Sequence, residues 1–199
     1  MTDAPVLRPL PPGELTDDQR RLYDAILAGR SSITSHTPLT ADDGSLVGPF
    51  DPLLRTPAVG EAVQRLGLAL RHGTSLPQAA TEAAVLTTAA HHGAEFERYA
   101  HVAITRAAGC ISDADISRIE RAEEPDEPVA ALAWRTARAV LSGQRLPADL
   151  VDEVTGRLGA PALVELVCTV GHYTHLALLM LALGIRPPAG ADRPADPAR

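Results

Sequence analysis

Cysteine is scarce in this sequence and basic residues are not in excess, and both shortages exclude classes of function. The 199 residues contain two cysteines, Cys110 and Cys168, which are far apart and lack the spacing of a metal site or a redox pair. We expect both to be structural, with Cys168 acting as a small hydrophobic residue in an apolar helix. The formal net charge of −7, with dispersed basic residues, argues against a nucleic-acid partner, because binding phosphates requires clustered Lys and Arg.

Long hydrophobic runs and strand patterns are also missing. The longest apolar run, Leu176–Ile185, is too short to span a bilayer, which takes about 18 to 20 residues. The start of the chain lacks the charged and apolar segments of a signal peptide. We therefore expect a cytoplasmic protein without a membrane partner or a disulfide. No stretch alternates apolar and polar residues as a strand would, so we expect an all-α fold.

Helix start and stop signals divide the chain. Thr16 opens a capping box with Gln19, and Ser75 is expected to cap a second helix that has Pro77 in its first turn. Glycines that should adopt the left-handed conformation just past a helix stand at positions 73, 93, 109, 143, 159 and 184. The expected helices cover residues 16–28, 57–72, 76–92, 94–108, 113–122, 127–142, 148–158 and 161–183.

The two ends of the chain differ from the helical part. Residues 1–13 hold four prolines and are expected to form an arm, and residues 186–199 form a Pro/Ala-rich tail. Residues 14–185 are then a single helical domain. Within it, residues 31–48 form a long polar connection that becomes apolar at its end. Loops of this length are mobile or functional, and we expect this one to line a pocket.

A short internal similarity suggests two related helical hairpins. Tyr99-Ala-His-Val-Ala and Tyr173-Thr-His-Leu-Ala each continue into an apolar helix that ends in glycine, and a Leu-Pro helix start precedes each of them. The two hairpins could pack about a pseudo-twofold axis, although a match this short also arises by chance. Only the first copy has a carboxylate, Glu97, one turn before its histidine.

The residues with the clearest chemistry are Glu82, Glu97 and His101. Glu97 and His101 are four residues apart and therefore leave the same face of one helix. Such pairs are common on solvated helices, where they add only about 0.2–0.5 kcal/mol. Here the preceding helix is almost wholly small and apolar, and the turns around Glu97 combine aromatic with ionisable residues. A carboxylate beside a histidine can transfer protons.

The spacing of these residues resembles the signature of the carboxymuconolactone decarboxylase family, in the alkylhydroperoxidase-like superfamily. Glu82 is followed by Ala94, Glu97 and His101 at intervals of 12, 3 and 4 residues. In the peroxidase branch, Cys-x-x-Cys occupies the places of Ala94 and Glu97, so the chain resembles the non-redox branch. The segment 93–101 follows the pattern Gly-Ala-x-Tyr-Glu-Trp-x-x-His of that branch, with Arg98 in place of the Trp. Together with segments 48–57 and 163–173, the resemblance spans roughly residues 15 to 185.

The resemblance implies an alkylhydroperoxidase-like helical bundle and a cofactor-independent enzyme. The expected activity is that of a decarboxylase-like lyase on a small carboxylated or enolisable acid or lactone. His101 would be the general acid that protonates an enolate, Glu97 would orient His101 or transfer a proton itself, and Glu82 would complete the cluster. The family also implies homo-oligomers built of dimers, as trimers or hexamers, and the 45% hydrophobic content agrees with buried helix faces between subunits.

Six further residues are candidates for substrate binding. The guanidinium groups that could clamp a carboxylate are those of Arg55, Arg71 and Arg98. The candidates for lining the pocket are Phe50, His91 and Tyr99. His91, Glu97 and His101 could also supply three metal ligands, yet the resemblance implies no cofactor, and we expect no metal.

Three alternatives remain open at this stage. A biosynthetic cyclase or isomerase on the same scaffold would use the pocket to fold its substrate and would tolerate the loss of His101. A peroxidase is disfavoured, because it needs a thiolate and a resolving thiol. A non-enzymatic oligomeric binding protein is the third. His172 and His175 lie on an otherwise apolar helix, where a hydrogen-bonded core histidine is commoner than a ligand.

Overall fold

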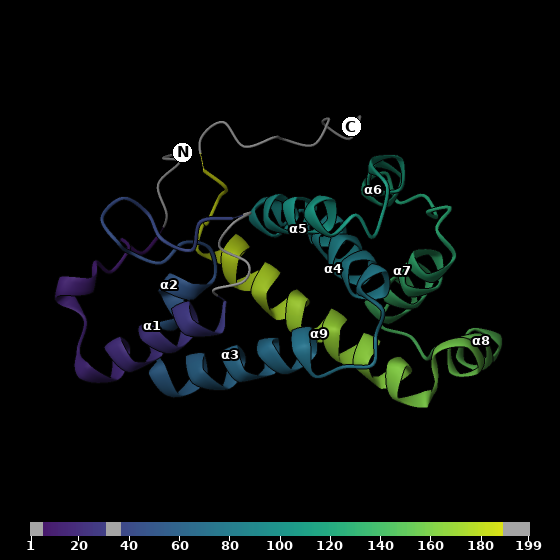
Figure 1. The fold of residues 1–199 in the computed structure, drawn as a ribbon, viewed down its shortest axis with the longest axis horizontal. Coiled ribbons are helices and arrows are strands. Elements are labelled where there is room, and N and C mark those ends of the chain that lie inside the picture. Colours follow the sequence, from purple (N-terminus) through teal and green to yellow (C-terminus); the bar gives the residue numbers. More distant parts are fainter. Residues whose placement is uncertain (1–5, 31–36, 189–199) are drawn as a thin grey trace.

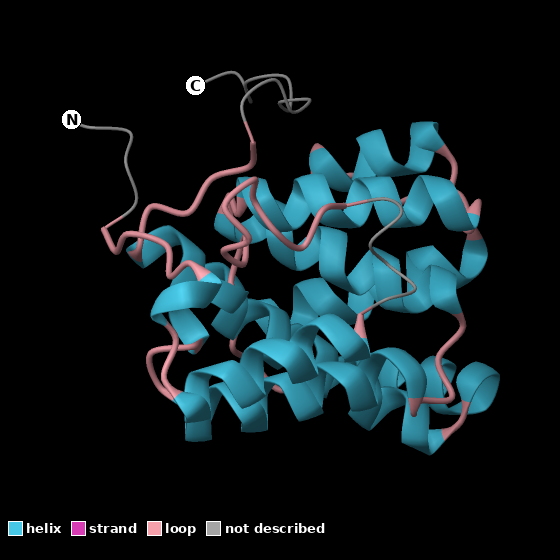
Figure 2. Cartoon of the chain, turned by 60° about the vertical axis from the view of Figure 1, so that its left-hand side comes forward, coloured by secondary structure: helices cyan, strands magenta, loops and turns pink. Residues whose placement is uncertain are grey.

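The computed structural model describes residues 6–30 and 37–188, and within these ranges the protein is all-helical (Figures 1 and 2). The α-helices are α1 (Asp17–Gly29), α2 (Phe50–Leu53), α3 (Pro57–His72), α4 (Gln78–His92), α5 (Glu95–Ala108), α6 (Asp113–Glu120), α7 (Pro128–Leu141), α8 (Ala148–Leu158) and α9 (Ala160–Ala182). A short 3₁₀ turn, Pro12–Glu14, precedes them.

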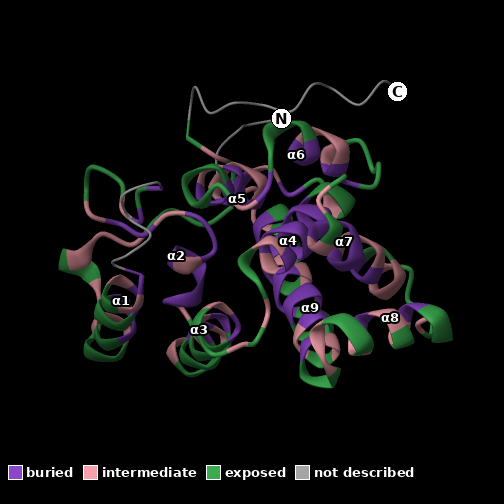
Figure 3. Ribbon diagram, turned by 45° about the vertical axis from the view of Figure 1, so that its right-hand side comes forward, coloured by how far each residue is buried: buried purple, intermediate pink, exposed green. Residues whose placement is uncertain are grey.

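Helix α4 lies at the centre of the molecule and packs against α5, α6, α7 and α9. Its sequence explains this position, because small apolar residues on every side let neighbouring helices approach closely. Ala80, Ala83 and Ala84 are fully buried, and Figure 3 shows much of α4 in the colour of buried residues, with exposed residues at its ends. The hydroxyls of Thr87 and Thr88 donate to carbonyl oxygens one turn earlier, at 2.6 and 2.8 Å. Glu82 is therefore the ionisable side chain in the buried middle of α4.

The long helix α9 crosses the molecule diagonally, between α3 on one side and α4 with α7 on the other (Figure 1). Among the described residues it is the one helix long and apolar enough to cross a membrane, by length and composition alone. Other parts of the protein bury 44% of its most apolar window. The buried part includes the polar residues Thr169, His172 and Tyr173, so one face of α9 belongs to the protein interior.

The helix boundaries expected from the sequence agree with the structure to within two residues at every end. The capping box of Thr16 and Gln19 is present. Ser75 was wrongly expected to be a cap: Pro77 holds that position, and the Ser75 amide and hydroxyl donate to Glu165 on α9 instead. Gly73, at φ −114°, is not left-handed. The sequence also gave no sign of α2, a single turn.

The arm and the long connection pack against the helices where the structure describes them. The Leu10 amide donates to Asp51 Oδ1 at 2.7 Å, and the Val6 amide donates to the Leu183 carbonyl at 2.9 Å. The connection forms a narrow turn between residues 39 and 47, held by backbone hydrogen bonds and by the Tyr23 hydroxyl, which donates to the Gly44 carbonyl. Residues 1–5, 31–36 and 189–199 of the predicted arm, connection and tail lie outside the described residues.

Candidate functional site

A small cavity of about 70 Å³, lined mainly by buried residues, lies where α3, α5 and α9 meet the end of α1 and the connection before α2. Its polar lining consists of Arg30, Thr37, Arg71, Glu97, His101, His172 and Tyr173. Its apolar lining includes Leu39, Phe50, Phe96, Ile104, Leu176 and Met180. The side chains that line the cavity therefore come from segments that are far apart in the sequence.

Glu82 and His101 form a direct pair behind this cavity. The distance between His101 Nδ1 and Glu82 Oε2 is 2.7 Å, and Arg71 Nη1 lies 3.7 Å from the other oxygen, Glu82 Oε1. Glu82 is 1% exposed and His101 is 5% exposed. Glu82 is held between a histidine and an arginine, and it is Glu82, rather than Glu97, that orients His101.

The electrostatics of the pair fix its protonation. Burial alone would raise the pKa of Glu82, but its interaction with His101, including the hydrogen bond, and the positive charge of Arg71 outweigh burial, and the pKa is lowered. Burial lowers the pKa of His101, and the positive charges of Arg71 and Arg30 add to this against the opposing effect of Glu82. Near neutral pH, we therefore assign an ionised Glu82 and a neutral His101. Because an ionised carboxylate only accepts hydrogen bonds, Nδ1 carries the proton and Nε2 keeps a lone pair.

Glu97 is in the opposite state. Its side chain is 3% exposed, and its Oε2 atom is buried without a hydrogen-bond partner among the described residues. Burial raises the pKa of Glu97 well above its ordinary value. A carboxyl group in such surroundings is held neutral and can donate a proton. The site thus contains two carboxyl groups with opposite protonation.

Two arginines supply positive charge beside the cavity. Arg71 donates through Nη2 to the Tyr173 hydroxyl at 2.9 Å, while its buried Nε has no partner among the described residues. Arg30 donates to Gln64 Oε1 at 2.9 and 3.2 Å and stacks over the Phe50 ring at 4.3 Å. Burial lowers the pKa of Arg30 to about 10, so Arg30 stays charged at neutral pH.

His172 completes the polar lining and is uncharged near neutral pH. Burial lowers the pKa of His172 to about 4, and the positive charges of Arg30, His175 and Arg71 contribute to the shift. Gly67 on α3 leaves room for this ring, since a Cβ at position 67 would lie 3.0 Å from His172 Nε2. Tyr173 stands edge-on between the two histidines, with ring centroids 5.0 Å from His101 and 5.2 Å from His172.

The structure brings together only some of the residues singled out in the sequence. Glu82, Glu97, His101, Arg71 and Phe50 lie at the cavity or directly behind it.

The other four candidates lie elsewhere. Arg98 faces α6 and pairs with Glu120, and Arg55 pairs with Asp51 at 2.8 Å. His91 is exposed at the end of α4. Tyr99 lines a separate, outer hollow. Arg98 leaves α5 on another face, Arg55 lies in the turn between α2 and α3, and His91 lies at the end of α4, which does not line the cavity.

Arg30, His172 and Tyr173 are members of the cavity that the sequence did not identify as site residues. Arg30 follows the last turn of α1, and nothing local distinguishes it from an exposed arginine. His172 and Tyr173 did carry a signal, because two adjacent polar rings on an apolar helix require buried partners. In the second copy of the suggested repeat, His175 is exposed, so it has no role corresponding to that of His101.

The structure also shows how exposed the two cysteines are and how candidate metal ligands are arranged. Cys168 is exposed on α9, contrary to its expected place in the core, and Cys110 is half-buried. Burial and the nearby Glu82 charge raise the pKa of the Cys110 thiol, which disfavours a thiolate. Within residues 6–30 and 37–188, no group of three or more His, Cys, Asp or Glu side chains is arranged to hold a metal ion.

Comparison with known proteins adds no identification. No model of a protein family matches the chain, and no curated protein matches it. What the protein does must therefore be argued from the cavity.

Proposed function

We propose that this protein is a cofactor-independent proton-transfer enzyme, a decarboxylase-like lyase of the carboxymuconolactone decarboxylase type. Its substrate would be a small carboxylated or enolisable acid or lactone. The observation that carries the proposal is a small cavity that brings together the buried carboxyl group of Glu97, whose Oε2 has no partner among the described residues, and the His101 ring, held at Nδ1 by Glu82. Environments that push two carboxyl groups to opposite protonation states supply acid and base at the same pH.

The balance of charge supports an anionic substrate. Arg30 is buried and Arg71 is largely buried, and among the described residues at the cavity Glu82 is the carboxylate that lies close enough to pair with an arginine. Within the described part of the chain, this leaves one positive charge at the cavity without a negative partner. A buried charge without a partner is costly, and a substrate carboxylate would supply the missing negative charge through a guanidinium hydrogen bond.

The protonation states indicate how a decarboxylation would proceed. The bond between the α carbon and the carboxylate breaks, carbon dioxide leaves, and the electron pair remains as an enolate. The positive charges of Arg30 and Arg71 would stabilise that enolate. Glu97 would donate its proton to the carbon, become a carboxylate and regain a proton from water. His101 Nε2 would act as a base where a reaction begins by removing a proton, as an isomerase would require.

This mechanism exchanges the roles expected from the sequence. His101 was the expected general acid, but its Nδ1 is engaged with Glu82, whereas burial raises the pKa of Glu97 and so favours its protonated form. We also propose that the protein is a cytoplasmic homo-oligomer, as expected from its sequence. A thiol peroxidase is not supported, because Cys110 has a raised pKa and Cys168 lies on the outer surface of α9.

The proposal is tested by screening small 3-oxo acids and carboxylated lactones for carbon dioxide release, and for exchange of α protons with deuterium. Glu97→Gln and His101→Gln keep approximate shape while removing a titrating group, and loss of one such group costs a factor of about 10²–10⁴ in rate. The control is the double variant Cys110→Ser and Cys168→Ser, which should keep its activity. A dead double-Ser variant with fully active Gln variants would disprove the acid–base assignment.

A further inference from the structure

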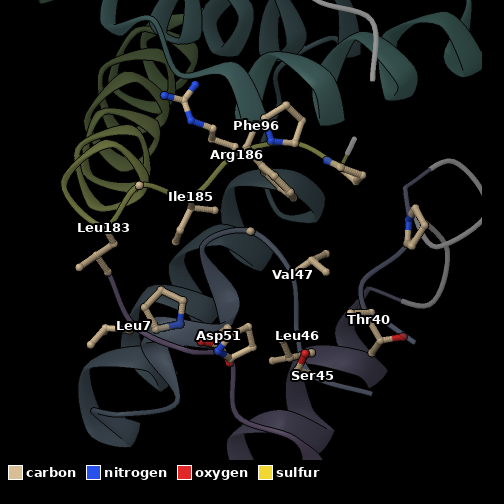
Figure 4. Close-up of a pocket in the computed structure, with 18 of the residues that line it drawn as sticks. Leu7, Thr40, Ser45, Leu46, Val47, Asp51, Phe96, Leu183, Ile185 and Arg186 are labelled. Atoms are coloured by element: carbon tan, nitrogen blue, oxygen red, sulfur yellow. The ribbon is translucent and has the colours of Figure 1, made fainter. Parts of the chain in front are cut away.

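A larger hollow of about 530 Å³ lies beside the cavity, open to the outside. It is bounded by the arm before α1, the connection before α2, the start of α5 and the segment after α9 (Figure 4). Its apolar walls are formed by Leu7, Leu46, Val47, Phe96, Leu183 and Ile185. Ligand sites for organic molecules typically measure about 300–1,000 Å³, so this outer hollow has the size of a ligand site.

The outer hollow adjoins the inner cavity through shared walls. Pro38, Val47 and Phe96 line both spaces. The connection is pressed directly onto Phe96, since a Cβ on Gly48 would lie 2.3 Å from Phe96 Cε1. The two spaces are therefore neighbours that share three residues, Pro38, Val47 and Phe96, and a ligand that displaces the side chains of Val47 and Phe96 could occupy both.

Three charged residues line the outer hollow: Asp51 and Arg186 have partners within the protein, and Asp42 is exposed to solvent. Asp51 binds Arg55 at 2.8 Å and accepts the Leu10 amide at 2.7 Å. Arg186 pairs with Glu95 at 3.1 Å. Charges that are already paired offer a ligand little new electrostatic attraction, so the chemistry of the hollow favours an apolar group.

We infer that the substrate is amphipathic, with an acidic head between Arg30 and Arg71 in the inner cavity and an apolar chain or ring in the outer hollow. The inference rests on the proposed function for the position of the head. The volumes support the division, because about 70 Å³ holds only a few water-sized groups at roughly 10–15 Å³ each. The reacting carbon lies in the cavity beside Glu97 and His101, and the outer hollow selects the substrate by its tail.

The inference is tested first on the unchanged protein, by calorimetric titration with acetate, butyrate, hexanoate and octanoate below their micelle concentrations. Each buried methylene should tighten binding about fourfold, as expected from the transfer energy of one methylene group. Hexanol has the tail without the head, and it should bind more weakly than hexanoate. Equal affinity for acetate and octanoate, or for hexanol and hexanoate, would overturn the inference.

Two neighbouring residues then test where the tail lies. Leu7 lines the outer hollow and Val6 does not, and both are exposed, so either should accept aspartate without unfolding the protein. Leu7→Asp should reduce the gain per methylene, and Val6→Asp should leave it unchanged. An identical chain-length series in both variants would place the tail elsewhere and refute the inference.

Arg71→Gln separates this inference from the proposed function. It should weaken the binding of every carboxylate, acetate included, with folding checked by thermal unfolding. If acetate binding is unaffected, the anion site of the proposed function fails. If acetate depends on Arg71 but chain length has no effect, the anion site stands and only the amphipathic substrate is refuted.

Discussion

At the scale of single residues, the protonation of Glu97 should affect the stability of the folded protein as well as the rate of its reaction. Its folded-state pKa is raised above the ordinary value of 4.5 by burial. Below pH 4.5, Glu97 is protonated in both states. As the pH rises toward the folded pKa, the unfolded state loses a proton that the folded state keeps, and stability falls. Glu97→Gln should therefore have a higher melting temperature than the natural protein at pH 7, with a difference that shrinks toward pH 4.

Glu82→Gln is the matched control for that measurement. It makes the same chemical change at an equally buried position, but it leaves Arg71 without its carboxylate partner. Removing one member of a buried ion pair typically costs about 3–5 kcal/mol. Thermal melts should therefore move in opposite directions for the two variants at neutral pH. A lower melting temperature for Glu97→Gln would mean that Glu97 is ionised in the folded protein.

Buried His172 should make the folded protein less stable at acidic pH. Its pKa is lowered by burial from 6.5 to about 4, so the unfolded state takes up a proton first as the pH falls. The stability contributed by neutral His172 is complete above pH 6.5 and is lost as the pH falls through about 4. The loss is roughly 3 kcal/mol. His172→Gln should flatten urea-unfolding stability between pH 6.5 and 4, while the exposed His175→Gln should not.

At the scale of elements, the connection packs so closely on α5 that one added methyl group, at Gly48, should destabilise the protein strongly. Gly48 has φ +66° and Gly93 has φ +67°, so alanine carries a similar backbone cost at both positions, about 1–2 kcal/mol. Only at Gly48 would the new Cβ collide with Phe96, since nothing lies within 4 Å of a Cβ at Gly93. Gly48→Ala should therefore be the more destabilising in denaturant titrations, and it should also alter ligand binding. Equal losses of stability in Gly48→Ala and Gly93→Ala would show that the connection can move away from Phe96 at little cost.

The helices were predictable because their signals are local. The capping box at Thr16 and the glycines that end α4 and α5 act within a few residues. The single turn of α2 was missed because four residues carry no periodicity. The connection was expected to line a pocket, and its described part lines both the cavity and the outer hollow.

The candidate site was only partly predictable, because its partners come from distant segments. Glu82, Glu97 and His101 share one hairpin, so their proximity follows from sequence spacing. Which carboxylate faces His101 depends on helix packing, and the structure places Glu82 there. Arg30 and Tyr173 are 143 positions apart in the chain, and no local pattern reports that both reach one cavity.

At the scale of the whole molecule, α3 and α9 present apolar residues to solvent. Val164, Val167, Leu178 and Leu181 are exposed on α9, and their spacing puts them within one face of the helix. Val59 and Leu66 are exposed two turns apart on α3, which packs beside α9. Exposed apolar side chains that gather on one helix face are candidates for an interaction surface. The homo-oligomer expected from the sequence has a candidate interface here.

We predict an oligomer whose interface includes this exposed face of α9. Light scattering at micromolar concentration should give a mass that is a multiple of the chain mass. Leu178→Glu, at the exposed apolar face of α9, should shift that mass toward the monomer, because a buried unpaired carboxylate is costly at an interface. Val6→Glu is the control, since Val6 is also exposed and apolar but lies in the arm. A monomeric natural protein would refute the oligomer, and an oligomeric mass unchanged in Leu178→Glu would move its interface away from α9.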